Sequence, residues 1–209
     1  KGEASRSKPL LQFALPMRLV LLPILGLVLA CSGRTAESPL PPPVAMTLFD
    51  FDSADEASWQ IVNDGVMGGR SQGYVEVSEG VLRFTGTLVT QGGGFTSVRA
   101  DRPVDLTGYD GVELRVRGGG RTFEVEVDDG TRRRGRRVSR RAPFETGEAW
   151  AWVRVPFSAL QTTVFGQSVS APPINLADVG HFGLYILDGQ DGPFRLEVDA
   201  IRAYRVDAD

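Results

Sequence analysis

Residues 112–127 read VELRVRGGGRTFEVEV, and this stretch decides the fold class. Apolar residues alternate with charged ones on both sides of three glycines: Val112, Leu114 and Val116 before them, Phe123 and Val125 after them. A period of two places the apolar side chains on one face of a strand and the charged ones on the other. Glycines between two such runs are typical of a turn. The stretch therefore predicts antiparallel strands with one buried and one solvated face.

The same pattern recurs along most of the chain. Helical turns are indicated only at 157–160 and 176–179, and no long amphipathic helix or internal repeat is present. Further strands are expected near 48–52, 59–62, 73–77, 80–85, 95–99, 150–155, 181–187, 194–198 and 201–206. The 25 glycines and 13 prolines agree with many turns. The sequence predicts an all-β fold, with a single β-sandwich domain over 47–207.

The N-terminal part has a different character. Residues 17–31 read MRLVLLPILGLVLAC, in which one arginine precedes a twelve-residue apolar run that ends at Cys31. The run is too short to span a bilayer, and the segment resembles the signal peptide and lipobox of bacterial lipoproteins, whose cysteine is acylated. Cys31 is the only cysteine, so it cannot form an internal disulfide. The alternatives are a plain cleaved signal peptide or an anchor helix.

This interpretation sets the expected organisation and localisation. Residues 1–16 precede a complete signal without an initiating methionine, and we interpret them as a misassigned start. Residues 32–46 are polar and then proline-rich, which predicts a semi-extended tether. Ser32 follows the cysteine in place of aspartate, which favours the outer membrane. We therefore expect an exported lipoprotein, anchored by acyl chains such as palmitate and facing the periplasm.

The charge of the chain excludes one class of partner. A net charge of −3, together with the expected export, gives no case for nucleic acid binding. A local basic run is nevertheless present, with seven arginines between Arg132 and Arg141. It predicts either contact with anionic lipids or an acidic partner, or a solvated hairpin loop offset by Asp128 and Asp129. The solvated loop is the favoured interpretation.

Two stretches are rich in glycine: NDGVMGGRS at 63–71, which has no apolar period, and GGGFTSVR at 92–99. Asparagine, aspartate and glycine in succession are a strong turn signal. A phosphate-binding loop also uses glycines, but here neither a Lys-Ser/Thr pair nor a helix follows. The first stretch is therefore predicted to be a tight, structured loop between strands.

Together the two stretches resemble the complex I intermediate-associated protein 30 family, whose hallmark is D-x-V-M-G-G-x-S followed by G-G-F-x-S-x-R. The matching residues are Asp64, Val66, Met67, Gly68, Gly69, Ser71, Gly93, Gly94, Phe95, Ser97 and Arg99. The resemblance extends over about 47–206. The chain departs from the family at Gly119, where aspartate is usual, and at 187–191, which lack a common lysine.

The resemblance implies a galactose-binding-like jelly-roll sandwich for which no catalytic residues are established. Founding members help to assemble respiratory complex I on the matrix side of the mitochondrial membrane. That side corresponds to the bacterial cytoplasm, so the family alone does not predict this role for an exported protein. We expect a non-catalytic module that binds an envelope protein or protein complex, as an assembly or scaffolding factor. The alternative is a carbohydrate-binding module of the cell envelope.

The candidate binding loop combines the motif residues with their polar neighbours, which either fix the loop or meet a partner. Its members are Asn63, Asp64, Met67, Gly68, Gly69, Arg70, Ser71, Gly93, Gly94, Phe95, Ser97 and Arg99. A glycan site would instead need an exposed aromatic residue on a concave face. Trp150 and Trp152 have the same strand parity, and both are expected to be buried.

Signals for catalysis and for metals are weak. His181 is the only histidine, and we expect a hydrogen-bonded structural role for it at a strand start. Convergence of His181 with two carboxylates in an open cleft would favour an enzyme instead. No cofactor is expected, although galactose-binding-like sandwiches often carry a structural Ca²⁺ between their first and last strands. Asp50, Asp52 and Asp199 are the candidate ligands, and surface carboxylates are the alternative interpretation.

Overall fold

The computed structural model describes residues 45–53 and 56–206. The expected misassigned start, signal peptide, Cys31 and most of the tether lie outside these residues. Strand β1 (Ala45–Phe49) begins two residues before the expected start of the domain. Within the described part of the chain, no helix has the length and apolar character needed to cross a membrane.

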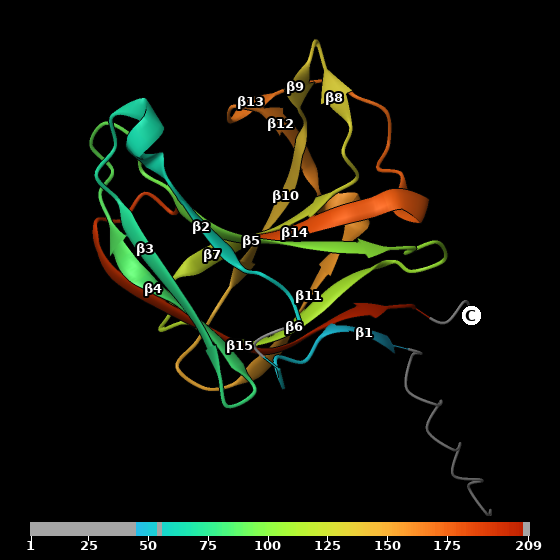
Figure 1. Cartoon of the computed structure of the whole chain (residues 1–209), viewed down its shortest axis with the longest axis horizontal. Coiled ribbons are helices and arrows are strands. Elements are labelled where there is room, and N and C mark those ends of the chain that lie inside the picture. The colour runs from blue at the N-terminus through green and yellow to red at the C-terminus, as the bar shows by residue number, and fades with distance from the viewer. Residues whose placement is uncertain (1–44, 54–55, 207–209) are drawn as a thin grey trace, which may run out of the picture. The chain divides into compact units, whose positions relative to one another are not determined.

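The described residues form two antiparallel sheets that pack face to face (Figure 1). The six-stranded sheet has the order β11-β6-β15-β4-β3, and β1 pairs with β15. The seven-stranded sheet has the order β13-β12-β10-β7-β14-β5-β2, while β8 and β9 pair only with each other. The strands after β1 are β2 (Gln60–Asn63), β3 (Gln72–Ser78), β4 (Val81–Leu88), β5 (Thr96–Val104), β6 (Gly111–Arg117), β7 (Thr122–Asp128), β8 (Arg132–Arg133), β9 (Arg136–Arg137), β10 (Ser139–Glu145), β11 (Ala151–Pro156), β12 (Gln161–Val164), β13 (Gln167–Ser168), β14 (Val179–Ile186) and β15 (Gly192–Tyr204).

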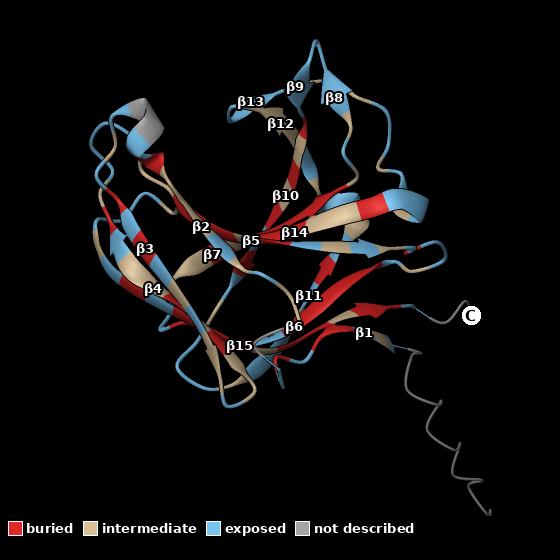
Figure 2. Ribbon diagram, in the orientation of Figure 1, coloured by how far each residue is buried: buried red, intermediate tan, exposed pale blue. Residues whose placement is uncertain are grey.

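The core lies between the two sheets, where alternate residues of each strand meet (Figure 2). The six-stranded sheet contributes Leu82, Phe84, Leu114 and Leu196, and the seven-stranded sheet contributes Val98, Phe123, Phe182 and Leu184. Burial of each such side chain stabilises the fold by about 1.5–3 kcal/mol. The prediction of an all-β sandwich from period-two alternation is confirmed, and so are both helical turns, η2 (Phe157–Ala159) and η3 (Leu176–Asp178).

Two predicted elements need correction. The segments 194–198 and 201–206 belong to one long strand, β15, whose register shifts between Val198 and Ala200. The arginine run is not a single solvated loop, because only β8, β9 and their turn form an exposed hairpin. Its last two arginines lie in β10, a strand of the seven-stranded sheet in which Ala142 and Phe144 are buried. The period of two in these buried residues is a strand signal that the prediction did not use.

The expected burial of the two tryptophans is also wrong. Trp152 is 42% exposed, and Trp150 is half-buried under the guanidinium groups of Arg115 and Arg117. In β11 the core-facing parity belongs to Val155, which is buried. Even-numbered residues of this strand therefore point away from the core.

Candidate functional site

The two glycine-rich stretches meet at one carboxylate. Asp64 begins the short helix η1 (Asp64–Met67) directly after β2, and its side chain is fully buried. Its oxygens accept hydrogen bonds from the Ser71 hydroxyl at 2.7 Å and the Ser71 amide at 3.1 Å. They also accept from the amides of Gly94 at 2.8 Å and Phe95 at 3.3 Å. One buried acceptor thus ties the β2–β3 connection to the β4–β5 connection.

The motif glycines are explained by how closely the backbone approaches this carboxylate. A Cβ on Gly69 would lie 2.1 Å from Asp64 Cγ, and one on Gly93 would lie 2.4 Å from Asp64 Oδ2. Gly68, with φ of 84°, takes the left-handed conformation that ends η1. Only glycine leaves room for the chain to wrap the carboxylate on both sides.

The hydrogen bonds also set the charge of the buried group. Burial alone would raise the pKa of the Asp64 carboxyl. The amides of Gly94, Phe95 and Ser71, with the Ser71 hydroxyl, outweigh burial and lower the pKa below its ordinary value. Asp64 is therefore an ionised carboxylate, and its oxygens accept hydrogen bonds from groups within the domain.

Most other members of the candidate binding loop also have internal partners. Asn63 accepts hydrogen bonds from the Gly73 amide at 3.1 Å and the Thr96 hydroxyl at 2.6 Å. Arg70 is exposed, and its guanidinium donates to Gln91 at 2.9 Å. The side chain of Met67 lies outside what the structure describes. A binding role for the loop stays a prediction, and its polar side chains other than Arg70 are engaged in holding it.

The last two motif residues, Ser97 and Arg99, lead to a different place. Both lie in β5 with their side chains on the outer face of the seven-stranded sheet. The Ser97 hydroxyl donates to the Val62 carbonyl at 3.3 Å and accepts from Arg99 Nε at 3.1 Å. The guanidinium carbon of Arg99 lies 4.9 Å from the ring centre of Tyr185 in β14.

A polar cluster surrounds this tyrosine on the outer face. Arg141 covers the same ring at 4.6 Å, so Tyr185 is only 5% exposed between two guanidinium groups. The Tyr185 hydroxyl donates to Glu126 Oε2 at 2.6 Å, and Ser139 donates to the other oxygen of Glu126. Register places Arg141, Glu126 and Arg99 in one row across β10, β7 and β5, with Gly183 of β14 inside the row. Glycine at that position makes room for the neighbouring side chains, because a Cβ on Gly183 would lie 2.9 Å from the Tyr185 ring and 3.2 Å from Glu126 Oε2.

A hollow of about 280 Å³ opens beside this row. Its lining consists of Ser58, Gln60, Val62, Arg99, Asp101, Glu126, Arg137, His181 and Phe182. His181 Nδ1 is hydrogen-bonded to Asp101, which confirms the expectation of a hydrogen-bonded histidine. The same histidine converges with the carboxylates of Asp101 and Glu126, the arrangement that sequence reasoning named as favourable to catalysis.

The face retains polar capacity that the fold does not use. Three buried polar atoms on it form no hydrogen bond with any described residue: Asp128 Oδ2, Arg141 Nε and Thr163 Oγ1. Asp128 Oδ2 lies 2.7 Å from Arg137 Nε as an ion pair, but without hydrogen-bond geometry. Buried polar groups are normally satisfied, so Arg141 Nε and Thr163 Oγ1, which have neither an ion pair nor a hydrogen bond at that atom among the described residues, are exceptions on this face.

Burial shifts the pKa values of several groups on the same face. Burial raises the pKa of Glu124, although Arg141 at 3.1 Å opposes the shift. Burial likewise raises the pKa of Asp128. Burial and the neighbouring Glu126 raise the pKa of Tyr185, which keeps its hydroxyl protonated as a donor. At these two carboxyls, unlike at Asp64, the effect of burial on the pKa exceeds the opposing effect of hydrogen bonds and arginines.

Comparison with known proteins now decides the family. The family model described as complex I intermediate-associated protein 30 matches residues 49–198. The chain belongs to the complex I intermediate-associated protein 30 family. A relative from Mus musculus, complex I intermediate-associated protein 30, mitochondrial, is 25% identical over 176 residues, covering 73% of this chain and 54% of that protein. A probable family protein from Caenorhabditis elegans is 32% identical over 95 residues, covering 44% of this chain and 28% of the relative. The chain thus spans about half or less of these relatives.

Solved structures show the fold of this family member. The family 11 carbohydrate-binding module from Clostridium thermocellum, in complex with a β-1,3-1,4-mixed-linked tetrasaccharide, superposes with a TM-score of 0.57 at 10% identity, covering 78% of this chain and 98% of that chain. A family 30 carbohydrate-binding module gives 0.52 at 16% identity, covering 78% and 99%. The galactose-binding-like sandwich implied by the resemblance is therefore confirmed. At these identities the likeness shows the fold alone.

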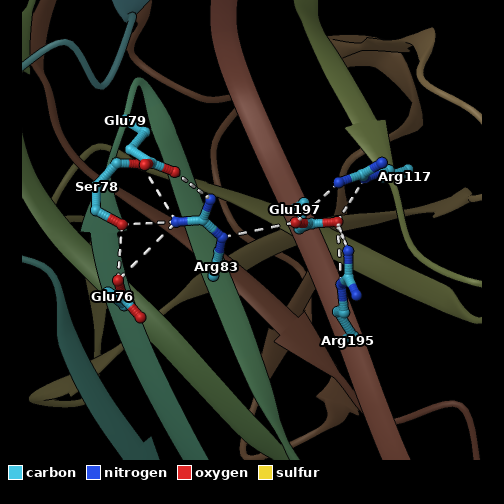
Figure 3. Close-up of polar contacts among 7 residues, drawn as sticks. All are labelled: Glu76, Ser78, Glu79, Arg83, Arg117, Arg195 and Glu197. Atoms are coloured by element: carbon cyan, nitrogen blue, oxygen red, sulfur yellow. Dashed lines mark hydrogen bonds and ion pairs between the residues drawn. The ribbon is translucent and has the colours of Figure 1, made fainter.

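A second hollow of this family member, about 450 Å³, lies on the six-stranded sheet. Beside it, Glu197 is buried and receives three arginines, Arg83, Arg117 and Arg195 (Figure 3). Burial would raise the pKa of Glu197, but hydrogen bonds from Arg117 and Arg195 lower it. Its carboxylate is paired with arginines from three strands, so these ion pairs connect β4, β6 and β15.

The candidate calcium ligands do not form a site. Asp199 lies at the register shift of β15 and pairs with Arg115, whose guanidinium occupies one of its oxygens. Asp50 and Asp52 are exposed, and Asp50 accepts a hydrogen bond from the Asp52 amide at 3.2 Å. Among the described residues, no group of three or more His, Cys, Asp or Glu is placed to hold a metal ion. These residues therefore do not fit a Ca²⁺ ion.

Proposed function

We propose that this chain is a non-catalytic binding module that holds a partner protein on the outer face of its seven-stranded sheet. The observation that carries the proposal is the polar hollow on this face, which is lined by Arg99, Asp101 and His181. Two buried atoms on the same face, Arg141 Nε and Thr163 Oγ1, form no hydrogen bond with a described residue. A protein partner supplies backbone and side-chain donors and acceptors at fixed spacing. Such a set of groups can match the positive and negative side chains of this face.

The hollow supports binding better than catalysis. Glu126 is the most enclosed carboxylate in it, and its two oxygens already accept from Ser139 and Tyr185. His181 is held by Asp101, a carboxylate that is 81% exposed. A catalytic base is commonly oriented by a buried partner in a site that excludes water. We therefore assign these groups to recognition.

The proposed setting of the module rests on the N-terminal sequence, and its proposed role rests on the family. We propose that Cys31 carries the lipid, that residues 32–46 act as a tether into the first strand, and that the domain faces the periplasm from the outer membrane. The relatives are complex I intermediate-associated proteins, and we propose a corresponding assembly or scaffolding role toward an envelope protein complex. No cofactor is required for such a role.

In-cell crosslinking of the full-length protein tests the proposal, with mass spectrometry of the captured proteins. The hollow variant combines Arg99→Ala with Glu126→Gln, and the matched loop variant is Arg70→Ala. The expected result is one envelope complex captured by the wild type and the loop variant, with at least about a tenfold loss in the hollow variant. Unfolding midpoints of all three proteins show whether the loss reflects binding or folding.

Equal capture by the hollow variant would move the interface away from this face. Capture lost only in the Arg70→Ala variant would support the predicted binding loop instead. Absence of any captured protein above background would remove the assembly role.

The alternative, a carbohydrate-binding module, is supported by one observation on the other sheet. Trp152 is 42% exposed on the outer face of β11, with Arg202 at 4.4 Å from its ring. On the outer face of the seven-stranded sheet, the ring of Tyr185 is only 5% exposed. Affinity electrophoresis in mixed-linkage β-glucan, comparing wild type with Trp152→Ala, tests this alternative. Retardation that Trp152→Ala abolishes would favour a glycan partner.

A further inference from the structure

The arginine run divides into two groups with different roles. Arg140 is buried and pairs with Asp129 at 3.4 Å, and Arg141 pairs with Glu124 at 3.1 Å. Arg137 pairs with Asp128 at 2.7 Å. The two neighbouring aspartates that would offset the run are thus engaged with its C-terminal arginines.

The four remaining arginines form an exposed cationic group. Arg132, Arg133, Arg134 and Arg136 are all exposed on the β8–β9 hairpin, and none forms an ion pair with a described residue. The Arg132 side chain donates to the Gly135 carbonyl at 3.2 Å across the turn. Four charges of one sign within five residues repel each other, and no described acidic residue forms an ion pair with them.

An apolar ring accompanies these charges. Phe165 lies in the β12–β13 turn, is 74% exposed, and contacts the Arg136 guanidinium at 4.8 Å. The two hairpins lie at the same end of the domain (Figure 1). Phe165 also has a φ of 49°, a left-handed conformation that is costly for a bulky residue. An exposed large ring on a strained turn does not contribute to the stability of the fold.

We propose that the β8–β9 hairpin and Phe165 form a docking surface for an anionic phospholipid bilayer. Arginines paired with an aromatic tip fit the membrane interface, where guanidinium groups meet phosphates and the ring enters the headgroup region. An acidic protein would match the charges, but it would leave the exposed ring unexplained. The chain carries a net charge of −3, so attraction to such a bilayer depends on this local patch.

Vesicle co-sedimentation of the full chain tests the proposal. Vesicles of equal parts phosphatidylglycerol and phosphatidylcholine are compared with vesicles of phosphatidylcholine alone. The hairpin variant is Arg133→Gln with Arg134→Gln, and the charge-matched control is Arg70→Gln with Arg205→Gln, two exposed arginines outside the hairpin. All proteins share the same N-terminal segment, so differences between variants report the domain surface.

The expected result is about tenfold weaker binding of the hairpin variant to the anionic vesicles, with the control within about twofold of wild type. Phe165→Trp should show quenching by brominated lipids in the anionic vesicles, which reports insertion of the tip. Equal loss in the control, equal binding of wild type to both vesicle types, or absence of quenching would overturn the proposal. Binding of the hairpin to soluble polyglutamate but not to vesicles would assign it to an acidic protein and overturn it as well.

Discussion

The loop carboxylate and the sheet-face carboxyls are all at least partly buried, yet their pKa values move in opposite directions. Asp64 collects four hydrogen-bond donors, and its pKa is lowered. Glu124 is half-buried and Asp128 is buried, both with less compensation, and their pKa values are raised. In the glycine loops the hydrogen-bond donors outweigh the effect of burial on the pKa. On the seven-stranded sheet the effect of burial outweighs that of the paired arginines.

The largest effect expected from this comparison is on stability. Asp64→Ala leaves four donors without their acceptor, and it should cost about 3–5 kcal/mol of the free energy of unfolding. Asp50→Ala is the matched control, because that carboxylate is exposed and accepts a hydrogen bond from a local amide, and it should change stability by less than about 0.5 kcal/mol. Urea denaturation measures both. Equal stabilities would contradict the structural role of Asp64.

Steric closeness to the same carboxylate gives the next effect. Gly93→Ala places a Cβ 2.4 Å from Asp64 Oδ2 and should cost about 2 kcal/mol. Gly65→Ala is its control, since a Cβ there meets no described atom within 4 Å, and it should be neutral within about 0.5 kcal/mol. Thermal unfolding distinguishes them. Similar midpoints would mean that the loops repack freely.

Opposite pKa shifts predict opposite pH dependences. Because the folded-state pKa of Asp64 lies below its ordinary value of 3.8, its stabilisation is full above that pH and is lost as pH falls through the folded pKa. The stability gap between wild type and Asp64→Asn should therefore narrow below about pH 4. Glu124 has a raised pKa, so Glu124→Gln should gain stability relative to wild type as pH rises past the ordinary value of 4.5. Denaturation series across pH check both slopes, and parallel curves would count against the comparison.

The smallest effect is expected at the exposed arginine of the loop. Arg70→Ala removes one solvent-exposed hydrogen bond to Gln91 and should change the free energy of unfolding by less than about 0.5 kcal/mol. Calorimetry of the purified variant measures it. A loss above about 1 kcal/mol would show that the loop depends on this contact as well.

Period-two alternation was sufficient to predict the sandwich, since it reports directly which side of each strand is buried. It also marked Glu124 and Glu126 as residues of one face, but alternation treats every outer residue as solvated. Whether such a residue lies beneath other side chains depends on long-range register, here Arg141 opposite Glu126 and Gly183 beside it. The site at Tyr185 therefore could not be predicted from any local segment.

The glycine motif, too, could be predicted only in part from the sequence. Its residues were expected to form a structured loop between strands, and they connect β2 to β3. The helical turn η1 at Asp64–Met67 was not predicted, because helical turns were expected only at 157–160 and 176–179. Which residues of the loop point inward was not predictable, since the donors to Asp64 come from residues 71, 94 and 95. Only their meeting in the fold separates Asp64 from Arg70.

Site-specific photo-crosslinking in cells tests the central claim most directly. One full-length protein carries the photoreactive residue at Gln60, which is exposed and lines the hollow, and the other carries it at Arg70 in the loop. If the seven-stranded sheet binds the partner, the protein labelled at Gln60 captures a defined product that the Arg99→Ala, Glu126→Gln background loses, and the protein labelled at Arg70 does not. Capture from Arg70 alone would contradict the account and place the interface on the glycine loops.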